Sequence, residues 1–151
     1  MQYEKLLEAL SEKLGIEIEN VGGATAVEVD GQVVILQLAG ARDGDILFTH
    51  ADLGEIPIEG KEALAASALS ANYLYQGTGG ATLALNSADG HLHLQRYDWL
   101  DRLDVDRTVE ILGRFAETAA AWRGILADYH PAEARPELEK PAFGGSDFLK
   151  V

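Results

Sequence analysis

The stretch "ANYLYQGTGGATLALNSADGHLHLQR", residues 71 to 96, determines how the whole sequence is interpreted. Three glycines follow a helix-like run, and two alternating apolar runs follow the glycines. A Walker phosphate loop has G-x-x-x-x-G-K-[ST] between a strand and a following helix, because amides at a helix N-terminus bind the anion. Here a strand follows the glycines, and no Lys-Ser or Lys-Thr completes the motif. We therefore predict that Gly77 is a left-handed helix C-cap and that Gly79 and Gly80 let the chain enter a strand.

Alternating apolar residues on either side of this stretch predict an antiparallel sheet. An SADG turn joins strands expected at residues 82 to 86 and 91 to 100. Upstream, Asp-Gly between two β-branched runs is a strong hairpin signal, because a type I′ turn needs positive φ at both central residues. It predicts strands at 25 to 30 and 32 to 39, with Val27 opposite Val34. A third strand, residues 45 to 53, follows the ARDGD turn.

Helical periodicity predicts three helices around these strands. The first occupies the N-terminal fifteen residues and ends at Gly15, and the second, residues 61 to 76, is rich in alanine and serine. The third begins near Asp104 or Asp106, either of which can cap it, and has the apolar stripe Ile111, Phe115, Ala119, Trp122 and Leu126. The fold class is therefore α+β, a single domain of order α-β-β-β-α-β-β-α over residues 1–128, with helices packed on a twisted antiparallel sheet. Residues 129–151 contain prolines and glycines without periodicity and are predicted to form a mobile tail.

Composition excludes several classes of function. The 151 residues suit one domain, and the absence of cysteine excludes disulfides, thiolate metal sites and a cysteine nucleophile. A net charge of −13, from 25 acidic and 12 basic side chains, repels phosphate backbones, so we expect no nucleic-acid partner. We expect no membrane insertion, because neither a signal peptide nor a membrane-spanning stretch is present. The expected location is the cytoplasm.

No set of residues predicts catalysis, a metal or a cofactor. His91 and His93 share one face of a strand, but no third ligand or carboxylate partner is evident. No G-x-S-x-G elbow surrounds a serine. The paired acids at 43 and 45 and at 104 and 106 are explained by turns and helix caps. We therefore predict that the protein is not an enzyme and has no cofactor.

The order of these features resembles the class I type III secretion chaperones, the CesT or Tir chaperone family. The resemblance rests on Ala71-Asn72 near the end of a small-residue helix, on "GTGGATLALN" and "ADGHLHLQR", and on "LDRLDVD" leading into "LGRFAETAAAWRGIL". It covers residues 3 to 128 and is strongest from 60 to 126. It implies a bacterial, cytoplasmic homodimer that binds the N-terminal region of a secreted effector in extended form and keeps it secretion-competent. The long proline-rich tail, and Trp99 in place of an aliphatic residue, depart from the family pattern.

Two surfaces are expected to carry this function. The resemblance implies a dimer interface on the second helix, at Ala65, Ala68, Leu69, Asn72 and Tyr73. An extended client can add a strand at a sheet edge while its apolar side chains enter nearby pockets. We expect the client to contact the apolar side chains of Leu6, Leu7, Val33, Ile35, Leu47 and Trp99. The alternative for each of them is packing against the protein's own helices.

Two other functions compete with the chaperone. One is a small regulatory or sensory domain of similar fold that binds a protein or ligand outside secretion. The other, which the missing catalytic motifs disfavour, is an enzyme.

Overall fold

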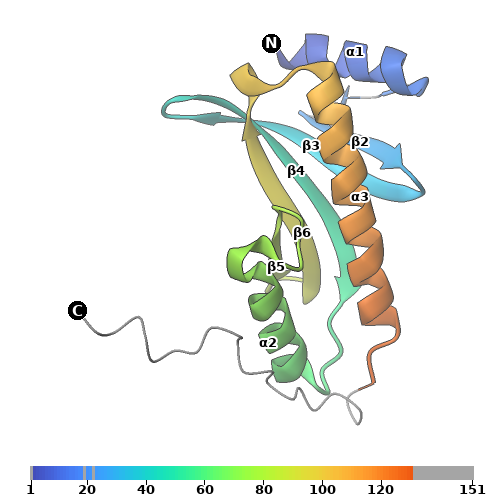
Figure 1. The fold of residues 1–151 in the computed structure, drawn as a ribbon, viewed down its shortest axis with the longest axis vertical. Helices are drawn as coiled ribbons and strands as arrows, with labels where there is room; N and C mark the ends of the chain where they lie inside the picture. Colours follow the sequence, from blue (N-terminus) through green and yellow to red (C-terminus); the bar gives the residue numbers. More distant parts are fainter. Residues whose placement is uncertain (1, 19, 22, 131–151) are drawn as a thin grey trace.

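The structure, a computed structural model, describes residues 2–18, 20–21 and 23–130. These residues form three α-helices and one sheet (Figure 1). The helices are α1 (Tyr3–Leu14), α2 (Lys61–Asn72) and α3 (Val105–Ala127). The strands are β1 (Asn20–Val21), β2 (Ala24–Val29), β3 (Gln32–Ala41), β4 (Gly44–Glu55), β5 (Thr82–Asn86) and β6 (His91–Trp99). The predicted order is confirmed, with the two-residue β1 added at its start.

All strand pairs are antiparallel, and the strands lie in the order β1-β2-β3-β4-β6-β5. Asp30 and Gly31 have φ of 50° and 76°, the two positive values that a type I′ hairpin requires. Val27 pairs with Val34, so the predicted register of this hairpin is confirmed. The hairpin between β3 and β4 projects beyond the helices (Figure 1).

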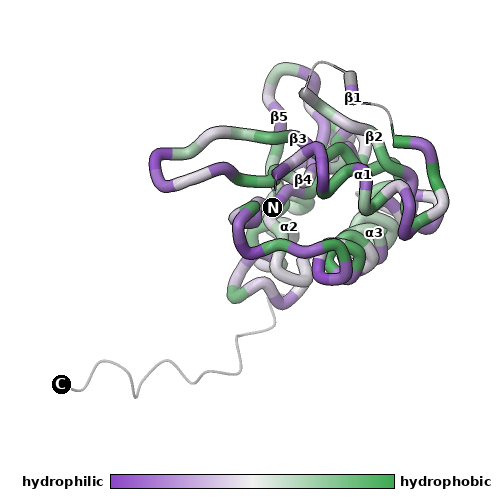
Figure 2. The backbone as a smooth tube through the Cα atoms, turned by 90° about the horizontal axis from the view of Figure 1, so that it is seen from above, coloured by the Kyte–Doolittle hydropathy of each residue, from purple (hydrophilic) through white to green (hydrophobic). Residues whose placement is uncertain are grey.

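The three helices lie on one side of the sheet (Figure 2). α3 contacts β2, β3 and β4, while α1 contacts α3 and α2 contacts β5. The buried cluster between the layers includes the predicted stripe of α3 from Ile111 to Trp122 and alternate residues of the strands, such as Val34, Leu36 and Leu94. We call this side of the sheet the covered face and the other side the outer face. One face of every central strand therefore has no helix over it.

The end of α2 differs from the prediction. The helix stops at Asn72, a 3-10 turn (Tyr73–Tyr75) follows, and the left-handed residues are Leu74 and Tyr75, with φ of 51° and 57°. Gly77 has no positive φ, so its predicted role as a left-handed cap is wrong. Its missing side chain instead allows close packing, because a Cβ there would lie 2.7 Å from Cβ of Ala71. Gly79 and Gly80 are left-handed, with φ of 59° and 89°.

Side-chain hydrogen bonds fix both ends of α3. Asp104 caps its start by accepting a hydrogen bond from the Arg107 amide at 2.7 Å, as one of the two predicted caps. Near the other end, Trp122 Nε1 donates to the Gly77 carbonyl at 2.9 Å and so joins α3 to the glycine loop. Beyond the helix, the Tyr129 hydroxyl donates to the Gly60 carbonyl at 2.7 Å. Most of the predicted tail, residues 131–151, lies outside the described residues.

The Gly77 contact gives a stability prediction. Gly77→Ala places a methyl group against Ala71 and should lower the free energy of unfolding by about 1–3 kcal/mol, the usual range for overpacking. The matched control is Gly113→Ala, since a Cβ at Gly113 meets nothing within 4 Å and alanine favours a helix by up to about 1 kcal/mol. Urea unfolding measures both variants. An unchanged midpoint for Gly77→Ala would contradict the packing described here.

Candidate protein-binding surfaces

The outer face of the sheet carries more apolar side chains than an ordinary wet surface. Adjacent strands place Ala39, Ile46 and Trp99 in one row and Gln37, Phe48 and Tyr97 in the next. Ile35 continues this face on β3, and Val33, 51% exposed, lies beyond it. Solvent-exposed apolar surface of this extent is typical of sites that bind another protein.

The two edges of the sheet differ in their capacity to accept another strand. At the β5 edge, the side-chain amide of Asn72 donates to the Leu83 carbonyl at 3.0 Å and accepts from the Leu83 amide at 2.8 Å. This pair of bonds imitates a neighbouring strand and uses the hydrogen-bonding groups that an edge offers. At the other edge, β1 pairs only with Ala24 and Thr25. Residues 26–29 of β2 pair with β3 on one side, and no described strand pairs with them on the other side.

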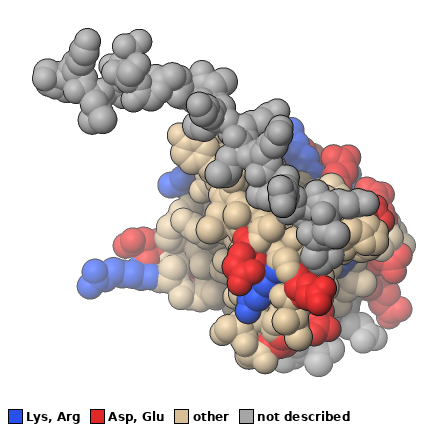
Figure 3. Space-filling model, turned by 90° about the horizontal axis from the view of Figure 1, so that it is seen from below, with Lys and Arg blue, Asp and Glu red and all other residues tan. Residues whose placement is uncertain are grey.

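A hollow between α1 and β1 has both apolar and acidic side chains in its wall. Its volume is about 460 Å³, and it lies between α1 and the start of the sheet, with Leu7 and Ile18 in its wall. Glu4, Glu8 and Glu12 stand one helical turn apart along it. The opposite end of the molecule, seen from below, has both acidic and basic side chains on its surface (Figure 3).

Of the residues predicted to bind the effector, some are accessible in the structure and others are buried. Val33, Ile35 and Trp99 lie on the outer face and keep part of their surface accessible. Leu6 and Leu47 are fully or almost fully buried in the core beneath α1 and α3, so they take the alternative role of core packing. Leu7 is also a core residue, but its remaining surface lines the hollow between α1 and β1.

Of the residues predicted to form the dimer interface, some are likewise accessible and others are buried or already hydrogen-bonded. Leu69 and Tyr73 are 71% and 60% exposed, and Leu74 and Tyr75, which follow directly in the sequence, are exposed as well. Ala68 is buried against its own subunit, and Asn72 is hydrogen-bonded to β5, so neither presents its side chain to a second copy. Ala65 is half-buried between these groups.

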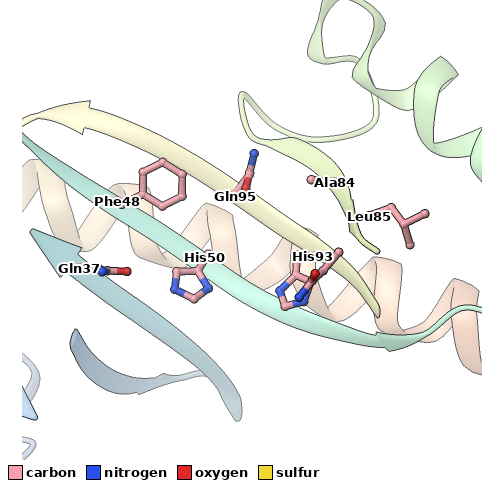
Figure 4. Close-up of a pocket in the computed structure, with 8 residues that line it drawn as sticks. Gln37, Phe48, His50, Ala84, Leu85, His93 and Gln95 are labelled. Atoms are coloured by element: carbon pink, nitrogen blue, oxygen red, sulfur yellow. The ribbon is translucent and has the colours of Figure 1, made fainter. Parts of the chain in front are cut away.

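A second hollow, of about 320 Å³, lies on the outer face between β3 and β5. Its wall includes Gln37, Phe48, His50, His93 and Gln95, and Figure 4 shows the two imidazole rings next to each other on β4 and β6. Burial lowers the pKa of His50, and the positive charge on His93 lowers it further. Sequence reasoning did not find this site, because its side chains come from strands that are distant in the sequence.

Beside this hollow, His91 forms an ion pair that the sequence did not predict. Its Nδ1 lies 2.8 Å from Oδ2 of Asp52, and Oδ1 of the same carboxylate accepts a hydrogen bond from the Gly54 amide. This hydrogen bond to Asp52 raises the pKa of His91. Burial opposes ionisation of Asp52, but the hydrogen bonds from His91 and Gly54 outweigh it, and the pKa of Asp52 is lowered. The expectation that His91 has no carboxylate partner is therefore wrong.

Neither a metal site nor a membrane span is found in the described part of the chain. Among residues 2–18, 20–21 and 23–130, no three histidine or carboxylate side chains come together as metal ligands. No helix in those ranges has the length and apolar character needed to cross a bilayer.

Sequence comparison identifies the family. The profile of the Tir chaperone protein (CesT) family matches residues 5–123. The chain belongs to the Tir chaperone protein (CesT) family. Membership of this chaperone family confirms the predicted resemblance and supports the prediction that the protein is not an enzyme. A comparison with curated proteins finds no significant match.

Solved structures share the CesT-type fold at low sequence identity. A chain of the HopA1–SchA chaperone–effector complex has 21% identity and a TM-score of 0.61, over 81% of this chain and 93% of that chain. A chain of the heterodimeric ExoU–SpcU complex, from the type III secretion system of Pseudomonas aeruginosa, has 19% identity and a TM-score of 0.60, over 80% and 96%. YbjN of E. coli, proposed to be a transcription regulator, has 13% identity and a TM-score of 0.56, over 83% and 93%. The fold therefore also occurs outside chaperone complexes. The family match favours the chaperone over the regulatory domain of similar fold.

The His91–Asp52 pair gives a pH prediction. Its stabilisation is lost as pH rises through the raised pKa of His91 and as pH falls through the lowered pKa of Asp52. The stability difference between wild type and Asp52→Asn should therefore be largest between the ordinary values of the two groups, 3.8 and 6.5. NMR titration should show the pKa of His91 falling in the variant, with His50 as the internal control. A His91 pKa that is the same in both proteins would refute the pairing.

Proposed function

We propose that this chain is a type III secretion chaperone that acts in the bacterial cytoplasm and binds the N-terminal region of a secreted effector in extended form. The observation that carries the proposal is the combination of an uncovered apolar sheet face with one open strand edge, in a member of the Tir chaperone protein (CesT) family. The HopA1–SchA structure, a chaperone–effector complex of the same fold, supports it.

The β2 edge offers a mechanism for holding a client extended. A client strand beside residues 26–29 gains main-chain hydrogen bonds, which do not depend on its sequence. Because side chains alternate across a strand, half of them fall on the outer face near Ile35, which pairs with Ala26. The other half fall on the covered-face side of the sheet, where Val27 is buried and Val29 is half-buried. Such a client is kept from folding because its backbone and apolar side chains are already engaged.

A homodimer is part of this proposal. Leu69, Tyr73, Leu74 and Tyr75 present apolar surface next to one another, and two of them have a left-handed backbone. A non-glycine residue in this conformation costs about 1–2 kcal/mol. A symmetric pair that buries this patch offsets that cost, and it leaves the β2 edge of each subunit accessible.

Client binding is tested by a matched pair of isoleucine substitutions. Ile35→Ser removes apolar contact area on the outer face and should weaken binding about tenfold, equivalent to about 1.4 kcal/mol. Ile58→Ser changes the same residue type at a loop position that is 91% exposed and should leave affinity unchanged. The client is captured on the immobilised chain from a lysate of a bacterium with a type III system and is identified by mass spectrometry. Calorimetry with its N-terminal fragment then gives the affinities, and equal affinities for both variants would contradict this docking face.

The dimer is tested by light scattering. The expected mass is near twice 16.2 kDa. Leu69→Arg should give the monomer mass, because an unpaired charge is costly to bury in an interface, whereas Ser67→Arg, at an exposed position on the same helix, should remain dimeric. A monomeric wild type would refute the dimer, and a dimeric Leu69→Arg would refute this interface.

A further inference from the structure

The hollow on the outer face has an unusual chemical composition for this protein. The polar side chains in its wall are Gln37, His50, Asn86, His93 and Gln95, and no carboxylate lines it. The hollow beside α1 and another beside the start of α2 both have glutamates in their walls. In a chain with 25 acidic residues, this wall is therefore rich in groups that can donate a hydrogen bond and free of negative charge.

His93 has a hydrogen-bonding atom without a partner in the described part of the chain. Its Nε2 is buried and has no partner among the described residues. Buried polar atoms are nearly always hydrogen-bonded, so an unpaired one indicates a missing ligand or water. Figure 4 shows the rings of His50, on β4, and His93, on β6, on the same side of the sheet, and both residues line the hollow. A group bound between them would reach both rings.

The charged side chains around the two rings indicate which chemical class of ligand can bind between them. β4 contributes His50 and Asp52, and β6 contributes His93 and His91. Gln37 on β3 and the wall residues of β5 (Ala84, Leu85 and Asn86) do not titrate. Asp52 lies opposite His93, but its hydrogen bonds go to His91 and Gly54, so neither His50 nor His93 has a carboxylate hydrogen-bond partner among the described residues.

We propose that the hollow binds a carboxylate on an Asp or Glu side chain of the client, and that the His50–His93 pair takes up a proton when it does so. The proton is drawn from solvent onto an imidazole nitrogen, and no bond other than that N–H forms. This inference rests on the proposed function and adds the chemical class of one client residue.

A carboxylate carried by a protein fits the site better than a free anion does. The net charge of −13 repels a small anion from the molecule, although salt limits this repulsion to about 8 Å at physiological ionic strength. A client segment gains apolar contacts with Phe48 and Leu85 at the same hollow, which a free anion lacks. These contacts hold the carboxylate next to the imidazoles.

The first experiment tests the hollow without a client. N-acetyl-glutamate N-methylamide is added to the full chain, and the imidazole signals of the histidines are followed by NMR from mildly acidic to mildly alkaline pH. The capped glutamate should raise the pKa of His50 and His93, with stronger binding at lower pH. The signals of His91, which already has Asp52, should not respond. Equal shifts with the capped glutamine, or none with the glutamate, would overturn the proposal.

Variants identify the residues that respond. His93→Gln keeps a polar side chain and removes the titrating ring, so the effect of capped glutamate on His50 should fall markedly. His91→Gln, on the same strand and face, is the matched control and should leave that effect intact. Urea unfolding verifies that both variants fold. An unchanged response of His50 in a folded His93→Gln variant would overturn the assignment.

The last experiment uses the client and separates this inference from the proposed function. Uptake of one proton makes the client affinity rise by up to about tenfold for each unit of decrease in pH. His93→Gln should abolish this dependence while keeping the affinity at alkaline pH. A client that binds equally at all pH values overturns the carboxylate assignment and leaves the chaperone function standing. If no client binds at any pH, the proposed function fails, while the NMR experiment still decides the chemistry of the hollow.

Discussion

The packing of all three helices against one face of the sheet is the constraint on which the rest of the structure depends. The long apolar stripe of α3 fits the covered face, where Val34, Leu36 and Leu94 alternate with residues that point away. Because successive side chains of a strand point to opposite faces, burial of one set places Ile35, Phe48 and Trp99 on the outer face. The sheet therefore has one face covered by helices and one face that is available to another polypeptide.

The same constraint explains why charge and apolar surface occur together. The many carboxylates provide solubility for a protein that leaves part of its sheet uncovered, since a large net charge opposes self-association. They are absent from the wall of the outer hollow, where the imidazole and amide groups gather. On the face that we propose for the client, the outer hollow thus combines apolar surface with a wall that contains no described carboxylate.

The sequence predicted the elements better than the contacts between distant elements. The Asp30-Gly31 hairpin, the stripe of α3 and the Asp104 cap are local, because residues within one or two turns determine them. The pairing of β4 with β6 joins residues about 40 positions apart, and it alone brings Asp52 to His91 and His50 to His93. A spacing rule cannot reveal such a pair. The sequence likewise could not predict whether Leu6 and Leu47 are buried, since an apolar side chain fits a core and a binding surface equally well.

Asn72 connects the local and the distant parts of the structure. Its side-chain amide donates to the Leu83 carbonyl and accepts from the Leu83 N–H. The last residue of α2 therefore hydrogen-bonds to β5 as a neighbouring strand would. The chain then turns within two residues, and Leu74 and Tyr75 take left-handed conformations that leave their side chains exposed. One carboxamide thereby occupies part of the β5 edge, ends the helix and creates the exposed apolar turn. Because an incoming strand needs free N–H and C=O groups, this arrangement favours strand addition at the β2 edge, on the opposite side of the sheet from the proposed dimer contact.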